Sequence, residues 1–193
     1  MRRSIVVLFF FHSLTLLAQS SKYDISLSYG LYKAPNYREA TDKFFFSADF
    51  DYHLSRRFVM STGFIAGVFT YADDKRTNIG PVNAKGYDSH SYFTIMYSFI
   101  SNNRLHVEGG LGVGLFTQRL KYPYNPPSSG GGTGPDQQFI SEYSFSRPEL
   151  PVKVSLYYRL GKHLSLGMKT GAFFMPGLLM NGIHVGPQIK VSI

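Results

Sequence analysis

The stretch from Ile183 to Ile193, which reads IHVGPQIKVSI, decides the fold. Every second position is apolar or proline: Ile183, Val185, Pro187, Ile189, Val191 and Ile193. The positions between them are polar or glycine: His184, Gly186, Gln188, Lys190 and Ser192. Successive side chains of a β-strand point to opposite faces. The pattern therefore predicts a strand with one apolar and one polar face.

Seven further segments show the same alternation. The eight expected strands are 22–32, 44–54, 58–70, 89–100, 105–117, 150–160, 164–174 and 183–193. A tilted strand of about 9 to 11 residues is long enough to cross a bilayer. We expect the last strand to pair with the first, because a closed sheet leaves no backbone groups unpaired in lipid. The prediction is an all-β fold, a membrane up-and-down antiparallel β-barrel of eight strands.

The connections between these segments are alternately short and long. Short turns are expected at 55–57, 101–104 and 161–163, and long loops at 34–43, 71–88 and 118–149. Outer-membrane barrels carry short turns on the periplasmic side and long loops outside the cell. We therefore expect both the N- and the C-terminus to be periplasmic. Gly, Pro and Ser dominate 125–135, which we expect to be a mobile loop tip.

The first 18 residues have the features of a secretory signal peptide. Two arginines precede a short apolar run, 5–17, and Ala18 is a small residue suited to cleavage. The run is shorter than the roughly 20 apolar residues that a membrane helix needs. We expect a signal peptide at 1–18 and an outer-membrane β-barrel domain at 19–193.

The formal charge of the chain is +8, from 20 basic and 12 acidic residues. A basic chain can bind nucleic acid, but export makes that partner unexpected here. Outer-membrane lipid, and anionic lipopolysaccharide in particular, is a partner that suits the charge better. The sequence contains no cysteine, which removes disulfides and thiolate–metal sites.

A soluble eight-stranded barrel would alternate in the same way, with its apolar face inward. The polar positions here hold mainly Ser, Gly, Tyr and Thr, and few of the charges expected on a water-exposed face. Aromatic residues also gather on the apolar face near the short turns: Tyr23, Tyr52, Phe58, Phe99 and Tyr158. Such a girdle is typical of a membrane interface and favours the membrane form.

The run 92–116 combines a strand, an Asn-Asn turn and the glycine-rich stretch 109–114. It resembles the central hairpin of the small eight-stranded outer-membrane β-barrel family, the OmpA/OmpX-like or porin-family barrels. The likeness extends over the mature chain as a pattern. It implies residence in the cell outer membrane, insertion by the barrel assembly machinery, and extracellular loops that carry any binding. Family members commonly have an aromatic residue at the last position of the closing strand, where this sequence has Ile193.

A glycine-rich stretch also marks nucleotide-binding loops, but that fingerprint follows a strand and opens a helix. Here the stretch lies inside a predicted strand. We expect Gly110, Gly112 and Gly114 to face the lumen and to leave room for large side chains such as Tyr92 and Tyr157.

Strand parity places eight charged side chains inside the barrel, which we call the lumen charge network. Its acids are Asp24, Asp49, Asp51 and Glu108, and its bases are Lys153, Arg159, Lys169 and Lys190. An eight-stranded barrel is only wide enough inside for side chains. Buried charges there must be paired, since an unpaired one is very costly. We expect an ion-paired plug, in which Lys190 and Asp24 lie at similar depth. A proton or ion pathway is the alternative.

The segment from Asp88 to Ser91, DSHS, contains the residue types of a lipid A-modifying barrel enzyme at the level of the outer leaflet. Catalysis would need His90 within hydrogen-bond reach of a serine, but strand parity puts Ser89 and Ser91 on the opposite face. His90 and His184 face inward without a third metal ligand. We expect a non-enzymatic protein with no cofactor and no metal, which acts as a structural or surface-interaction barrel. A lipid A-modifying enzyme and a small conducting pore are the alternatives, and a surface or envelope-complex partner is left open.

Overall fold

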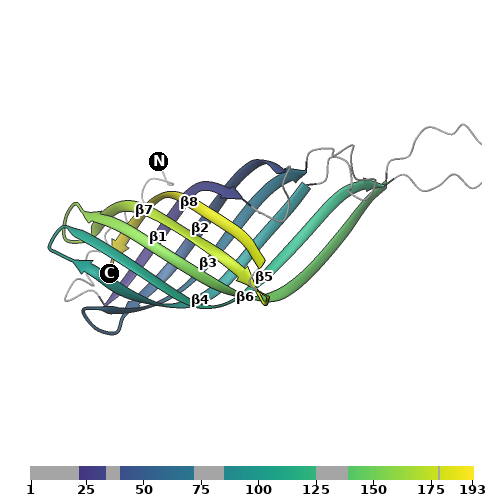
Figure 1. Cartoon of the computed structure of the whole chain (residues 1–193). Coiled ribbons are helices and arrows are strands. Elements are labelled where there is room, and N and C mark those ends of the chain that lie inside the picture. The colour runs from purple at the N-terminus through teal and green to yellow at the C-terminus, as the bar shows by residue number, and fades with distance from the viewer. Residues whose placement is uncertain (1–21, 34–39, 72–84, 125–138, 178) are drawn as a thin grey trace, which may run out of the picture.

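The computed structural model describes residues 22–33, 40–71, 85–124, 139–177 and 179–193. The predicted signal peptide 1–18 and the predicted loop tip 125–135 lie outside these ranges. The described chain forms eight strands in one closed antiparallel barrel (Figure 1). The strands are β1 (Tyr23–Lys33), β2 (Ala40–His53), β3 (Phe58–Tyr71), β4 (Lys85–Ser101), β5 (Leu105–Tyr124), β6 (Phe139–Arg159), β7 (Leu164–Met175) and β8 (Leu179–Ser192). The predicted fold class and the number of strands are confirmed.

The barrel closes where β8 meets β1, as expected. Leu27 lies opposite Ile189 in this ladder, and Ser26 lies opposite Lys190. The amide of Ile193 donates to the carbonyl of Tyr23, with a nitrogen–oxygen distance of 2.8 Å. The start of β1 and the end of β8 therefore lie at the same end of the barrel as the three short turns, here called the short-turn end.

Several strands are longer than the alternation indicated. β5 and β6 continue as a paired ladder up to Tyr124 and Phe139, so much of the predicted loop 118–149 is strand (Figure 1). β2 and β4 likewise begin before the predicted positions 44 and 89. The glycine- and proline-rich centre of the predicted loop suggested that its flanks were loop as well. Those flanks are rich in aromatic residues, which favour strands.

The apolar face of the wall points outward. Leu31 and Leu111 are 61% and 70% exposed, whereas the inward positions are mostly polar and buried. This arrangement is the reverse of a soluble barrel and fits a wall surrounded by lipid. Aromatic residues predicted for the girdle are exposed at the short-turn end, Tyr52 only partly: Tyr23, Tyr52, Phe58, Phe99 and Tyr158.

Among the described residues, no helix is long and apolar enough to span a membrane.

Glycines in the wall make room for large interior side chains, although they are not the expected ones. A Cβ placed on Gly63 would lie 2.7 Å from the hydroxyl of Tyr92, and one on Gly167 would lie 2.7 Å from Cβ of Tyr157. Neither glycine belongs to the stretch 109–114. Within that stretch, Gly114 instead leaves space for the side chain of Glu149, 3.1 Å from the placed Cβ.

Substitution of Gly63 by alanine tests this packing. The new methyl group would meet both Tyr92 and Asp49, so we expect Gly63→Ala to lower the free energy of unfolding by about 1–3 kcal/mol. Urea unfolding of the refolded barrel in lipid vesicles measures this loss of unfolding free energy. Gly161 is the control, because a Cβ there meets no atom within 4 Å and Gly161→Ala should leave stability unchanged or slightly raised. Equal losses from the two variants would contradict this account.

Candidate functional site

The middle of the barrel holds one carboxylate between two lysines. Asp49 on β2 receives Lys153 from β6 at 2.7 Å and Lys169 from β7 at 2.5 Å. The hydroxyl of Tyr92 on β4 donates to Asp49 at 2.5 Å, and the Oγ of Ser61 accepts from Lys153 at 3.0 Å. All these side chains are buried. They come from different walls of the barrel and meet across the lumen at this level.

A second cluster lies nearer the short-turn end and is built around Lys190. Its Nζ lies 2.8 Å from Asp51, 3.4 Å from Glu108 and 3.7 Å from Asp24. Tyr157 donates to Glu108 at 2.6 Å, and its ring centre lies 4.3 Å from the lysine nitrogen. His53 contacts Asp24 at 2.8 Å. Three carboxylates here face one lysine.

The sequence suggested Asp24 as the partner of Lys190, and in the structure Asp24 is one of three acids around it. In the ladder, Lys190 lies opposite Ser26 and Asp24 lies opposite Ser192, so the expected pair is offset by two residues. The ammonium group of Lys190 makes its shortest carboxylate contact with Asp51 on β2. Asp24 is the most distant of the three acids in this cluster.

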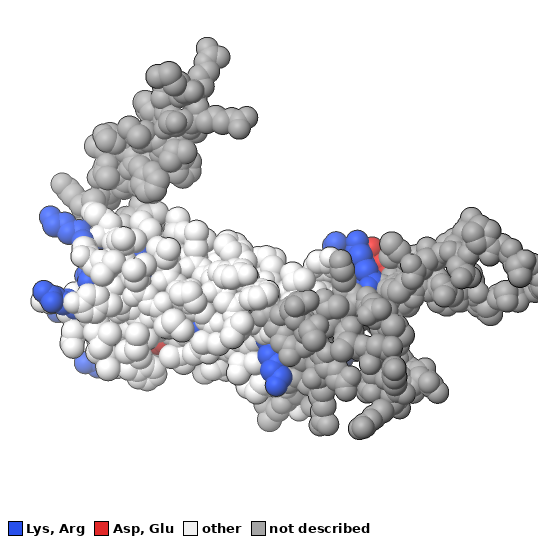
Figure 2. Space-filling model, turned by 90° about the horizontal axis from the view of Figure 1, so that it is seen from above, with Lys and Arg blue, Asp and Glu red and all other residues white. Residues whose placement is uncertain are grey.

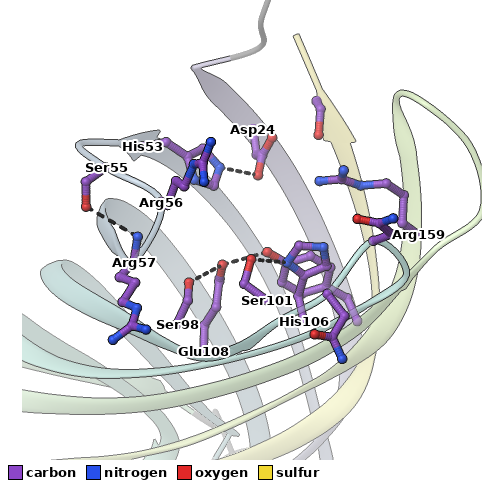
Figure 3. Close-up of a pocket in the computed structure, with 14 residues that line it drawn as sticks. Asp24, His53, Ser55, Arg56, Arg57, Ser98, Ser101, His106, Glu108 and Arg159 are labelled. Carbon is purple, nitrogen blue, oxygen red and sulfur yellow. Dashed lines mark hydrogen bonds and ion pairs between the residues drawn. The ribbon is translucent and has the colours of Figure 1, made fainter.

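Arg159 does not enter either cluster. It is the last residue of β6 and is exposed at the short-turn end. There it lines the mouth of the barrel, a cavity of about 710 Å³ with Asp24 and Glu108 among its other lining residues (Figure 3). The expected inward parity is correct, but the mouth is wide and wet, so the guanidinium needs no buried partner. The structure thus brings together seven of the eight side chains expected in the lumen charge network.

A third polar cluster lies toward the long-loop end and includes residues that sequence reasoning missed. His90 contacts the carboxylate of Glu149 through Nδ1 at 2.9 Å and the hydroxyl of Tyr32 through Nε2 at 2.9 Å. Tyr32 donates to Asp88 at 2.8 Å, and Gln118 donates to the other oxygen of Asp88 at 2.8 Å. The sequence pattern includes Glu149 in the predicted loop 118–149. Continuing the inward positions Lys153 and Pro151 by two residues toward the N-terminus would have placed the Glu149 side chain inside the barrel.

The third cluster does not form a serine–histidine pair. Both ring nitrogens of His90 are already occupied, and its ring stacks on Phe173 with centres 3.9 Å apart. Ser89 points the other way and donates to the carbonyl of Thr117 at 3.3 Å. His184, also inward, packs against the rings of Phe45 and Phe173. No group of three or more potential metal ligands occurs in the described part of the chain.

Comparisons with known proteins identify the fold. No protein-family model matches the sequence. No curated protein sequence matches it either. Among solved structures, Ail of Yersinia pestis in complex with the heparin analogue sucrose octasulfate is similar, with 14% identity, 89% of this chain and 99% of Ail covered, and a TM-score of 0.55. Neisserial surface protein A is similar at 11% identity, with 90% and 98% covered and a TM-score of 0.52.

The resemblance seen in the sequence is therefore confirmed as a likeness of fold. The chain has the architecture of small eight-stranded outer-membrane barrels. Identities this low show the fold alone.

Loss of the central lysine of the second cluster should destabilise the barrel strongly. Lys190→Ala would leave three carboxylates buried without their cation, so we expect a loss of about 3–5 kcal/mol in unfolding free energy. Adding Asp51→Asn should recover part of that loss, because one of the unpaired charges disappears. Urea unfolding followed by gel mobility measures both variants.

Arg159→Gln is the matched control, since this exposed side chain should change stability by less than about 0.5 kcal/mol. A loss for Arg159→Gln as large as that for Lys190→Ala would show that the exposed arginine contributes to the network after all.

Proposed function

We propose that this chain is a non-enzymatic barrel of the cell outer membrane whose lumen is plugged. Its role is structural or surface-interacting, through its extracellular loops. The observation that carries the proposal is the buried Asp49, which bridges Lys153 and Lys169 across the barrel. An ion passing along the lumen would have to separate these pairs in a low-dielectric space, at a cost of several kcal/mol.

The outward apolar face and the aromatic girdle support insertion in a bilayer. With the short turns on the periplasmic side, both termini are periplasmic, and the long β5–β6 hairpin projects from the cell. The lipid partners are outer-membrane lipid and lipopolysaccharide, and the barrel assembly machinery inserts the chain. Loops held by a rigid wall are the usual place for binding a surface or envelope-complex partner.

Bilayer conductance tests the plug. The purified barrel should shift its mobility on unboiled gels, which shows that it is folded, and it should give no steady single-channel current. A stable current that Lys169→Ala alters, without a change in the unfolding midpoint, would replace the plug with a small pore. A mature chain that stays with soluble periplasmic proteins and shows no mobility shift would remove the membrane barrel altogether.

The enzyme alternative has less support, because the two nitrogens of His90 contact Tyr32 and Glu149. A mass shift of lipid A on deletion of the gene would nevertheless favour it.

The topology is tested by an epitope tag inserted at 128–134, which lies outside the described residues. We expect the tag to be accessible to antibody on intact cells, because this tract joins the two strands of the longest hairpin. A tag placed in the short turn at Asn102–Asn103 is the control and should bind antibody only after the envelope is opened. The reverse pattern would invert the orientation.

A further inference from the structure

The short-turn end carries an unbalanced positive charge on its surface. The six exposed basic residues there are Lys22, Arg56, Arg57, Arg104, Arg159 and Lys162. The three acids at this end are Asp24, Asp51 and Glu108, and all are buried inside the barrel. Lys and Arg side chains accordingly project from this end of the molecule (Figure 2). An anionic surface facing this end would meet cations that no exposed acid offsets in the described part of the chain.

Two of these arginines are held against tyrosines on the outward face of the wall. Arg57, in the β2–β3 turn, donates from Nη1 to the hydroxyl of Tyr97 at 3.0 Å. Arg104, in the β4–β5 turn, donates in the same way to Tyr158 at 3.3 Å. The chain therefore uses the same contact twice, at neighbouring short turns. In Figure 3 the side chain of Arg57 points away from Asp24, which lines the mouth of the barrel.

The tyrosines fix the depth of these guanidinium groups. Tyr97 lies on the outward face and packs edge-on against Phe58 and Phe99, with ring centres 5.3 Å apart in each pair. Phe99 is 66% exposed and Tyr158 is 42% exposed on the same face. Aromatic rings of this kind sit at the level of the lipid headgroups. The two guanidinium groups therefore lie where lipid phosphates lie.

Each of the two arginines keeps donors for a ligand. A guanidinium has five N–H groups in a planar fork that matches phosphate, and the tyrosine takes one of them. Among the described residues, neither Arg57 nor Arg104 is ion-paired with a carboxylate. The tyrosine hydroxyl limits the freedom of the side chain, so less entropy is lost when a phosphate binds.

We propose that the pairs Arg57–Tyr97 and Arg104–Tyr158 are two binding sites for anionic phospholipid in the leaflet that contacts the short turns. The proposal rests on the membrane insertion and orientation proposed above. Phosphatidylglycerol is the headgroup that the surface favours. A zwitterionic headgroup brings an ammonium group as well as a phosphate, and the guanidinium group of the site repels that ammonium group. A basic residue near an anionic lipid surface is worth about a fivefold gain in affinity, so the two sites together give about twenty-five-fold.

Lipid titration of the folded barrel tests the sites. Refolded protein in detergent is titrated with phosphatidylglycerol or phosphatidylcholine, and native mass spectrometry measures the affinity for the first bound lipid. We expect the first phosphatidylglycerol to bind about fivefold more tightly than the first phosphatidylcholine in the wild type. Arg57→Gln combined with Arg104→Gln should bring the ratio close to one. Tyr97→Phe with Tyr158→Phe should reduce it in part, because the guanidinium groups are then no longer held in place.

Arg119→Gln with Lys121→Gln is the matched control, since it removes two exposed charges at the opposite end of β5 and should leave the preference unchanged. A wild-type ratio near one, or a preference that survives the loss of both arginines, would overturn the proposal. So would displacement of the lipid by peptidoglycan fragments, which would assign the surface to that polymer. Mobility shifts on unboiled gels are recorded for every variant. A folded, inserted barrel without lipid preference defeats only this inference, whereas a chain that does not insert defeats the proposed function.

Discussion

Backbone groups in the wall of this barrel must find their partners within the protein, because lipid offers none. The pairing of β1 with β8 meets that requirement by removing both edges of the sheet. Closure by eight strands has a second consequence, since it sets the width of the lumen. The interior then has room for side chains, and the charged groups of the ionic clusters find their partners on other strands.

The two ionic clusters are unbalanced in opposite directions, and the sheet places them next to each other. Asp49 faces two lysines, whereas Lys190 faces three carboxylates. Asp49 and Asp51 are two residues apart on the same face of β2, so a positive excess lies one step along the strand from a negative excess. Charges this close in a low-dielectric interior interact strongly. The seven side chains therefore act as one electrostatic network. The charge excess of each cluster is partly offset by the opposite excess of the other.

Alternation in the sequence predicted the fold and the inward face well, because both depend only on the two-residue period of a strand. It predicted contacts across the lumen poorly. The contact between Lys153 and Asp49 depends on the tilt and stagger of the strands in the closed barrel. The two-residue period of a strand gives no information about either. Arg159 shows a related limit, since parity says nothing about whether a strand end is buried or wet. Glu149 was missed for a different reason, because a strand can continue past the apolar band once its outward residues no longer need to face lipid.

Whether a cationic side chain is lysine or arginine depends on where it lies in the barrel. Among the residues whose burial the structure describes, the buried Lys and Arg side chains are all lysines, whereas four of the six exposed ones at the short-turn end are arginines. Lys169 shows why: its single nitrogen has three donors, and they reach Ser47 at 3.1 Å, Asp49 at 2.5 Å and Tyr92 at 2.9 Å. A guanidinium in the same space would have to find acceptors for five N–H groups in one plane. At the membrane surface the unused N–H groups of an arginine are available to phosphate oxygens. Lysine therefore suits the buried interior of this barrel, and arginine suits its exposed short-turn end.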